Sequence, residues 1–358
     1  MEGPLDRHNC ATLDVNNDNI PDVLCGLGAV SGTQFGFNEV YVTNATDGSL
    51  QKAPQGHGLD KYPTMRNRFM KTLKGADGSD LVFLATKGVR REDGLENNHR
   101  MFRLVHPSSN STTNNSTVYF EEVVPKPWAR YTEASCVEVV DINQDGLDDI
   151  VVCNRKGRAM AFIQQADASW DRVIFQGGFA YDWRNVRIAD MTGDGVNDVV
   201  VVGYGGLHSR FKPTSYVRIF RGLPEKPYFN LTSDGFFFGR SLPHASPDLE
   251  LLDVNGDGHY DIYVVQVNQK DEGGYCSIRF NRTDWWTGGY LNFVPPLDDT
   301  PDLLLVSTPH LRRHFVAENM THSEPGCGHF VTTFGDNRTM ILAQGFRDRP
   351  GHNLLLKW

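Results

Sequence analysis

The sequence has no long hydrophobic segment and no concentration of basic charge. No apolar run among its 358 residues approaches the roughly 18 residues that a membrane-spanning helix needs. Lys and Arg together number 35 against 44 Asp and Glu, and they are scattered along the chain, which argues against a nucleic-acid partner. Hydrophobic residues make up 39% of the chain and aromatic residues 11%, which is too many core-forming residues for a disordered chain. The sequence therefore predicts a folded protein that neither spans a membrane nor binds nucleic acid.

The motifs of common enzyme classes are absent as well. No HExxH, GxSxG, GxxxxGK[ST] or CxxC occurs. Pairs of neighbouring acids do occur, but a chain with 44 Asp and Glu contains such pairs by chance. We therefore expect no catalytic residue and no enzymatic activity.

The first ten residues lack the apolar segment of a signal peptide. Several other features indicate the secretory pathway, since six cysteines form an even set and N-x-Ser/Thr sequons recur in polar, turn-like segments. We therefore expect a glycoprotein of the extracellular space, the cell surface or the secretory-pathway lumen, with its leader removed or outside this sequence. The eight sequons are at Asn44, Asn110, Asn114, Asn115, Asn230, Asn281, Asn319 and Asn337.

Four segments of the chain share one acidic pattern. Each carries oxygen-bearing side chains at its first, third, fifth and ninth positions, and three of the four have Gly at the sixth. Each is followed by an apolar run rich in Val and Ile, which predicts a strand, a tight acidic loop and a second strand. The segments are Asp14–Asp22 (DVNNDNIPD), Asp141–Asp149 (DINQDGLDD), Asp190–Asp198 (DMTGDGVND) and Asp253–Asp261 (DVNGDGHYD).

This pattern is typical of a calcium-binding loop. Ca²⁺ takes about six to eight oxygen ligands, and carboxylates spaced around a tight turn can converge on one ion. The alternative is a set of Asx turns that bind no metal. Four copies with the same spacing of oxygen-bearing residues argue against this alternative. An EF-hand is excluded, because its loop ends in Glu at the twelfth position, where this chain has Cys25, Val152, Val201 and Val264. We expect about four structural Ca²⁺ ions, bound by side chains and by the backbone carbonyl of the seventh residue: Asp14, Asn16, Asp18, Ile20 and Asp22; Asp141, Asn143, Asp145, Leu147 and Asp149; Asp190, Thr192, Asp194, Val196 and Asp198; Asp253, Asn255, Asp257, His259 and Asp261.

These loops, set between apolar strands, resemble the FG-GAP/VCBS repeats of integrin-α-like β-propellers. The resemblance implies an all-β fold in which each repeat is one four-stranded blade and the acidic loop joins its first two strands. Weaker copies occur at Gly75–Ala85, Pro301–Ser307 and Phe334–Ala343. We expect a single β-propeller domain over residues 1–358. Seven blades are favoured because the family has seven, while the chain length suggests six. The first loop departs from the pattern at Asn19, where the others have Gly.

Two blades can be predicted strand by strand. The first has the strands ASCVEVV, DIVVCN, RAMAFIQQ and WDRVIFQG between residues 134 and 177. The next has WRNVRIA, DVVVVGY, SYVRIFRG and a weaker PYFNLT. The closing segment HNLLLKW is expected to be a third strand. Strands that are apolar on both faces must be covered on both sides, as radial packing of blades does.

The cysteines fit the same arrangement. Cys10 and Cys25 flank the first acidic loop, and Cys136 and Cys153 flank the second, so that each pair faces across one hairpin. We expect both pairs to form disulfides, with buried free thiols as the alternative. Cys276 and Cys327 then remain as a third pair by elimination.

A ligand-binding site is harder to locate. Trp285 and Trp286 lie in a polar loop that contains Gly, where adjacent aromatic residues often stack against sugars or partner side chains. Packing against the edge of a blade is the alternative for both. The favoured function is an adhesion or binding module for an extracellular protein or glycan ligand. The alternatives are a glycan-binding lectin and a polysaccharide-active enzyme on a propeller scaffold.

Overall fold

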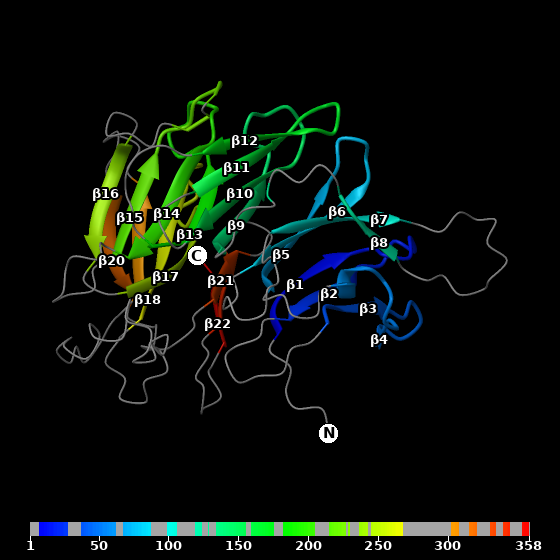
Figure 1. Cartoon of the computed structure of the whole chain (residues 1–358). Coiled ribbons are helices and arrows are strands. Elements are labelled where there is room, and N and C mark those ends of the chain that lie inside the picture. The colour runs from blue at the N-terminus through cyan, green and yellow to red at the C-terminus, as the bar shows by residue number, and fades with distance from the viewer. Residues whose placement is uncertain are drawn as a thin grey trace, which may run out of the picture. The chain divides into compact units, whose positions relative to one another are not determined.

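The strands of the computed structural model form six antiparallel sheets, five with four strands and one with three (Figure 1). A single 3-10 turn, η1 (Leu59–Lys61), is the one helical element in the described part of the chain. The all-β class and the four-stranded sheets expected for blades are therefore confirmed. The structure describes residues 7–27, 37–61, 67–86, 99–105, 119–123, 128, 134–154, 159–174, 182–204, 215–226, 228–229, 236–242, 245–267, 302–307, 315–320, 330–333, 339–343 and 353–357.

The chain divides into two compact units. Unit 1 comprises residues 1–154 and 159–174, and unit 2 comprises residues 155–158 and 175–358. Each unit consists of whole sheets, and the first strands of neighbouring sheets within a unit lie next to one another. A single domain over residues 1–358, and the number of blades, stay predictions.

Unit 1 contains three sheets in which each strand pairs with the next one along the chain. This simple up-and-down order needs only hairpin connections, which suits a sequence rich in turn-forming residues. The strands are β1 (Arg7–Leu13), β2 (Asp22–Leu27), β3 (Glu39–Thr43) and β4 (Leu50–Lys52); β5 (Asn67–Lys74), β6 (Asp80–Thr86), β7 (Arg100–Val105) and β8 (Tyr119–Glu122); β9 (Ala134–Val140), β10 (Asp149–Asn154), β11 (Ala159–Gln164) and β12 (Trp170–Ile174).

Unit 2 repeats this order in two four-stranded sheets and one three-stranded sheet. The strands are β13 (Asp182–Ala189), β14 (Asp198–Tyr204), β15 (Ser215–Phe220) and β16 (Phe236–Leu242); β17 (Ala245–Leu252), β18 (Asp261–Val267), β19 (Asp302–Ser307) and β20 (Phe315–Met320); β21 (Phe330–Thr333), β22 (Thr339–Ala343) and β23 (Asn353–Lys357).

The sheets of unit 1 pack face to face through apolar side chains. In β6, Val82 and Leu84 belong to one buried cluster, which includes Leu24 of the first sheet. Their neighbours Leu81 and Phe83 belong to another, which reaches the third sheet. Because successive side chains of a strand point to opposite faces, a sheet covered on both sides needs a continuous apolar run. The run LVFLA of this strand is such a sequence, and all five of its residues are buried.

The strand-by-strand prediction is confirmed for the third sheet and wrong in one strand of the fourth. The segment PYFNLT forms an isolated bridge between Gly222 and Phe229, and the fourth strand of that sheet is β16. The expectation that Pro301–Ser307 is a copy of the repeat is also wrong, because β19 in this segment pairs with β18 as the third strand of the fifth sheet. The closing strand β23 is third in its sheet, as expected.

Two predicted disulfides are present. Cys10 and Cys25 are directly opposite in β1 and β2, with 4.1 Å between their Cα atoms. Cys136 and Cys153 are opposite in β9 and β10, with a Cα separation of 5.0 Å. The hairpin register therefore accounts for both bonds. The expected pair Cys276 and Cys327 lies outside the described residues.

Candidate metal-binding loops

Each acidic segment connects the first two strands of a sheet. We call them loop 1 (Asp14–Asp22), loop 2 (Asp141–Asp149), loop 3 (Asp190–Asp198) and loop 4 (Asp253–Asp261). Their central residues are exposed, whereas the ninth residue, which begins the second strand, is fully buried in all four. Loops 1 and 2 belong to unit 1, and loops 3 and 4 belong to unit 2.

The aspartate at the first position organises each turn. In loop 2, Oδ1 of Asp141 accepts the backbone N–H of Asp145 at 3.1 Å, and Oδ2 accepts that of Gly146 at 2.8 Å. The same two bonds occur in the other three loops, at 2.7–3.2 Å. The fifth-position carboxylate accepts the N–H of the seventh residue in all four loops. The bond between the fifth and seventh residues is the Asx turn considered above, whereas the first-position aspartate accepts N–H groups four and five residues further along, across the turn.

Two residues in each loop have left-handed backbone conformations. The sixth residue has a φ of 83–85° where it is Gly, and Asn19 keeps the turn in loop 1 with a φ of 66°. Asn tolerates this region better than other non-glycine residues, so the departure of loop 1 leaves its shape unchanged. The fourth position is also left-handed, which the sequence pattern did not reveal; its residues are Asn17, Gln144, Gly193 and Gly256.

The aspartate at the ninth position ties three parts of the sheet together. In loop 2, Oδ2 of Asp149 accepts the N–H of Ile142 at 2.9 Å, and Oδ1 accepts that of Gln164, at the end of the third strand, at 2.8 Å. The first bond recurs in all four loops, and the second recurs in loops 1 and 3 with Thr43 and Gly222 as donors. The sequence pattern predicted a metal ligand at this position, and the structure adds a structural role for the same carboxylate.

Burial changes the acidity of these inner carboxylates. It raises the pKa of Asp149 to about 7, against the lowering effect of the hydrogen bonds from Ile142 and Gln164; the nearby charges of Asp145 and Asp141 raise it further. Burial likewise raises the pKa of Asp198 to about 6. A nearby cation would favour the charged form of both groups.

The third position tests whether the loops suit Ca²⁺. In loops 1, 2 and 4 the Asn side chain at this position donates to Oδ2 of the fifth-position carboxylate at 2.9–3.0 Å. Oδ1 of Asn143 is buried and has no hydrogen-bond partner. An unpaired amide oxygen next to the Asp145 carboxylate is the type of donor that a hard cation binds. Loop 2 therefore fits calcium, with the Asp145 carboxylate and the Asn143 oxygen as the readiest ligands. In loops 1 and 4 the corresponding Asn oxygens accept the backbone N–H groups of Asp18 and Asp257, at 3.1 and 3.0 Å, so a cation there would replace these bonds.

The described part of the chain holds no group of three or more His, Cys, Asp or Glu side chains that could bind a metal ion together. The orientation of the ninth-position carboxylate, which faces backbone N–H groups inside the hairpin, is consistent with this. A complete calcium site in these loops requires Asn or Thr and carbonyl oxygens as well, and the full ligand set stays a prediction.

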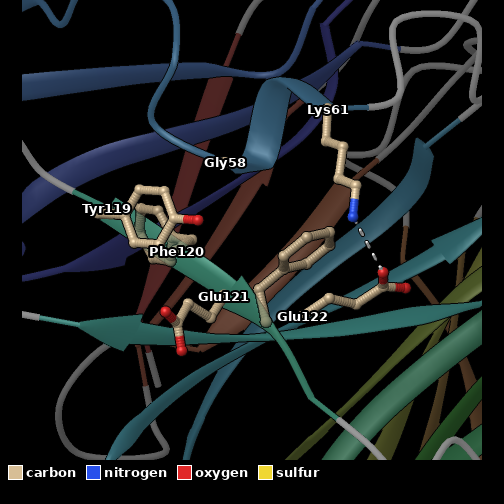
Figure 2. A pocket seen from close by; sticks show the side chains of 7 residues that line it. Gly58, Lys61, Tyr119, Phe120, Glu121 and Glu122 are labelled. Atoms are coloured by element: carbon tan, nitrogen blue, oxygen red, sulfur yellow. Dashed lines mark ion pairs between the residues drawn. The ribbon is translucent and has the colours of Figure 1, made fainter.

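A shallow pocket of about 370 Å³ lies elsewhere in unit 1 (Figure 2). Nζ of Lys61 is 3.8 Å from Oε2 of Glu122, which also pairs with Arg100, so two cations balance this carboxylate. Glu121 and Glu122 are consecutive in β8 and point to opposite faces. They do not converge as a catalytic pair of acids. The lining residues are Gly58, Lys61, Phe102, Tyr119, Phe120, Glu121 and Glu122.

Several predicted site residues lie outside the described part of the chain. These include Trp285 and Trp286, so neither role considered for them is tested. Of the sequons, Asn44 lies in the connection between β3 and β4, and Asn319 lies in β20. The six others, at Asn110, Asn114, Asn115, Asn230, Asn281 and Asn337, are also outside it. No described helix is long and apolar enough to cross a membrane.

Comparison with known protein families identifies one repeat in this chain. Residues 141–201, which run from the start of loop 2 into β14, match the protein-family model described as FG-GAP-like repeat. The repeat is FG-GAP-like. The resemblance inferred from the acidic loops is thus confirmed for this segment. No curated protein matches the sequence.

Similar solved structures include two crystal structures of BBS1N in complex with ARL6DN. The crystal soaked with lead is 12% identical over 94% of this chain and 76% of that chain, with a TM-score of 0.46. The crystal soaked with mercury is 12% identical over 95% of this chain and 77% of that chain, with a TM-score of 0.47.

Proposed function

We propose that this chain is a calcium-stabilised β-propeller that serves as an extracellular binding module and catalyses no reaction. The observation that carries the proposal is the fourfold recurrence of one loop with one hydrogen-bond pattern, at the same place in four sheets. Four copies of an acidic turn concentrate negative charge at the same end of each hairpin, and a divalent cation relieves that repulsion. With four ions bound, the formal net charge of −9 would become −1.

The calcium has a structural role in this proposal. An ion that binds only the folded protein adds RT ln(1 + [L]/Kd) to the free energy of unfolding, about 2.7 kcal/mol per site at a hundredfold excess over Kd. The loops join the first two strands of their sheets, so the ion acts on the hairpin that begins each blade. The first carboxylate already orders the turn through backbone bonds, so calcium would bind a largely preformed loop.

The proposed partner is an extracellular protein or a glycan. Strands covered on both faces leave connections between strands as the surface that can vary, and binding residues are commonly found on such connections. Trp285 and Trp286 are the proposed contributors. Two disulfides that close hairpins support an oxidising environment, because cytosolic thiols are kept reduced. A glycan array distinguishes a lectin from a module that binds protein.

Thermal unfolding with and without chelator tests the calcium role. We expect EDTA to lower the melting temperature clearly, calcium to restore it, and magnesium to restore less, because Mg²⁺ requires a smaller and more regular oxygen shell. Asp145→Ala should remove one bound ion and reduce the calcium-dependent shift. Asp167→Ala is the matched control, since Asp167 is exposed and accepts the N–H of Ser169 in the turn between β11 and β12 of the same sheet. Equal melting temperatures with EDTA and with calcium would refute the role of calcium.

A further inference from the structure

Loop 3 differs from the other three loops in the side chain that donates a hydrogen bond to its fifth-position carboxylate. In loops 1, 2 and 4, Oδ2 of this carboxylate accepts a hydrogen bond from the neutral Asn at the third position. In loop 3 the third residue is Thr192, and Oδ2 of Asp194 accepts instead from the guanidinium of Arg221, at 3.1 Å. Within the described residues, no Lys or Arg pairs with Asp18, Asp145 or Asp257.

Strand register shows that Arg221 occupies a position that is equivalent in four sheets of this chain. Phe220, Tyr41, Phe162 and Leu305 each pair with the residue that follows the ninth loop position. The next residue of the chain is Arg221 beside loop 3, directly after the end of β15, whereas it is Val42, Ile163 and Val306 beside loops 1, 2 and 4. An apolar residue thus occupies this position in three sheets, and a cation occupies it in the fourth.

The backbone holds Arg221 close to loop 3. The next residue, Gly222, donates its N–H to Oδ1 of Asp198 at 2.8 Å. A Cβ on Gly222 would clash with the carbonyl oxygen of Asn197, so only Gly permits this close approach to the loop. The guanidinium therefore starts from a backbone position that is anchored to the loop it contacts.

The second sheet has a related contact, one residue earlier in the strand register. Its Arg103 pairs with Leu81, as Phe220 pairs with Val199, so Leu104 occupies the position that corresponds to Arg221. The first hairpin of this sheet, between β5 and β6, lacks the nine-residue acidic loop. There Arg103, from the third strand β7, pairs with Asp77 of the turn at 3.0 Å. An arginine from the third strand thus pairs with a turn aspartate in a hairpin that has only a weaker copy of the acidic pattern.

A guanidinium and a calcium ion compete for the same oxygen. Arg has five N–H donors and no acceptor, and it stays charged at any working pH, so it cannot become a metal ligand by turning around as an Asn side chain can. A positive charge about 5 Å from a dication opposes its binding by roughly tenfold even when water screens the interaction. Thr192 adds a hydroxyl where the other loops have an amide oxygen.

We propose that Arg221 is a built-in counter-ion that keeps loop 3 folded without metal, so that calcium fills loops 1, 2 and 4 and binds loop 3 at least about tenfold more weakly. The inference rests on the proposed binding of calcium by these loops. The proposal predicts that loop 3 is the loop least affected when calcium is removed.

Calcium titration of the full chain, followed by native mass spectrometry, tests the proposal. The wild-type protein should bind three ions tightly and a fourth more weakly. Arg221→Ile, which introduces the residue found beside loop 2, should raise the affinity of the fourth site at least about tenfold. The reciprocal variant Val42→Arg should reduce the tight ions from three to two. Lys226→Ile, the matched control, removes one charge from the same connection and should bind three tight ions.

Melting in EDTA provides a second measurement. Without metal, Arg221→Ile should lower the melting temperature of the chelated protein by about 2–4 °C relative to Lys226→Ile, because Asp194 loses its counter-ion. Saturating calcium should remove this difference. Four equal sites in the wild type, or an unchanged fourth site in Arg221→Ile, would overturn the role of Arg221 alone. A wild-type protein that binds no calcium would instead refute the proposed function.

Discussion

Replacement of Asp149 by Ala should destabilise its sheet whether or not calcium is present. The side chain is fully buried, and its two oxygens accept the N–H groups of Ile142 and Gln164 at 2.9 and 2.8 Å. Each buried donor left without an acceptor costs about 1–3 kcal/mol, which sums to about 2–6 kcal/mol. Burial of the carboxylate is itself unfavourable, as its raised pKa shows, and this offsets part of the loss. We therefore expect a decrease of about 2–4 kcal/mol in the free energy of unfolding.

Urea unfolding in EDTA and in calcium measures this loss, and hydrogen–deuterium exchange of the Ile142 and Gln164 amides locates it. Asp149→Asn retains one acceptor oxygen and should lose about half as much stability. Asp148→Ala is the control, because the side chain of Asp148 accepts a single, exposed hydrogen bond, from the backbone N–H of Lys74. The structural argument is wrong if Asp149→Ala and the wild type have the same free energy of unfolding in EDTA and differ only in calcium. The carboxylate would then contribute to stability only by binding the metal.

Two further predictions concern acid stability and the ligand site. Burial lowers the pKa of His99 from 6.5 to about 3. Between pH 3 and pH 6.5 the unfolded chain binds a proton at His99 that the native protein does not bind. The free energy of unfolding is therefore not reduced by His99 above pH 6.5, and it decreases by up to about 1.4 kcal/mol per pH unit below that value. His99→Asn retains an acceptor for the Thr86 N–H and should flatten the loss of stability measured by urea unfolding between pH 6.5 and 4.5; an unchanged slope would contradict the assignment. Replacement of Trp285 and Trp286 by Ala should weaken binding to a glycan that the array identifies and leave the melting temperature nearly unchanged. A large drop in melting temperature would instead place both residues in the core.

Local sequence patterns predicted the hairpins well. Alternation and Val/Ile enrichment located the first two strands around each acidic loop, and the cysteine spacing around loops 1 and 2 predicted both described disulfides. These features depend on residues within one hairpin, where the turn determines the register. The spacing of Asp, Asn and Gly likewise predicted the tight acidic turns, whereas the ordering of the backbone by their carboxylates was only the alternative to calcium binding.

The predictions that failed concern pairing between distant segments. PDLLLVS has the composition of a second strand, yet β19 pairs with β18 across a connection of more than thirty residues. The fourth strand of the fourth sheet lies in FFFGRSL rather than in PYFNLT for the same reason. Composition indicates that a segment is a strand, but its partner is determined by which faces it can cover once the sheet forms.

The sequence by itself determined the all-β class, the hairpins, the acidic loops and two disulfides, because each follows from residues that are close along the chain. Only the tertiary structure decided that the ninth aspartate faces the third strand, that the run in β6 divides between two cores, and that Arg221 neutralises Asp194. Each of these contacts joins residues 15 or more positions apart, whose approach depends on how strands pair and sheets stack. A lone arginine after a strand carries no local signal of its partner, and its role becomes visible only when the register places it where three other sheets have an apolar residue.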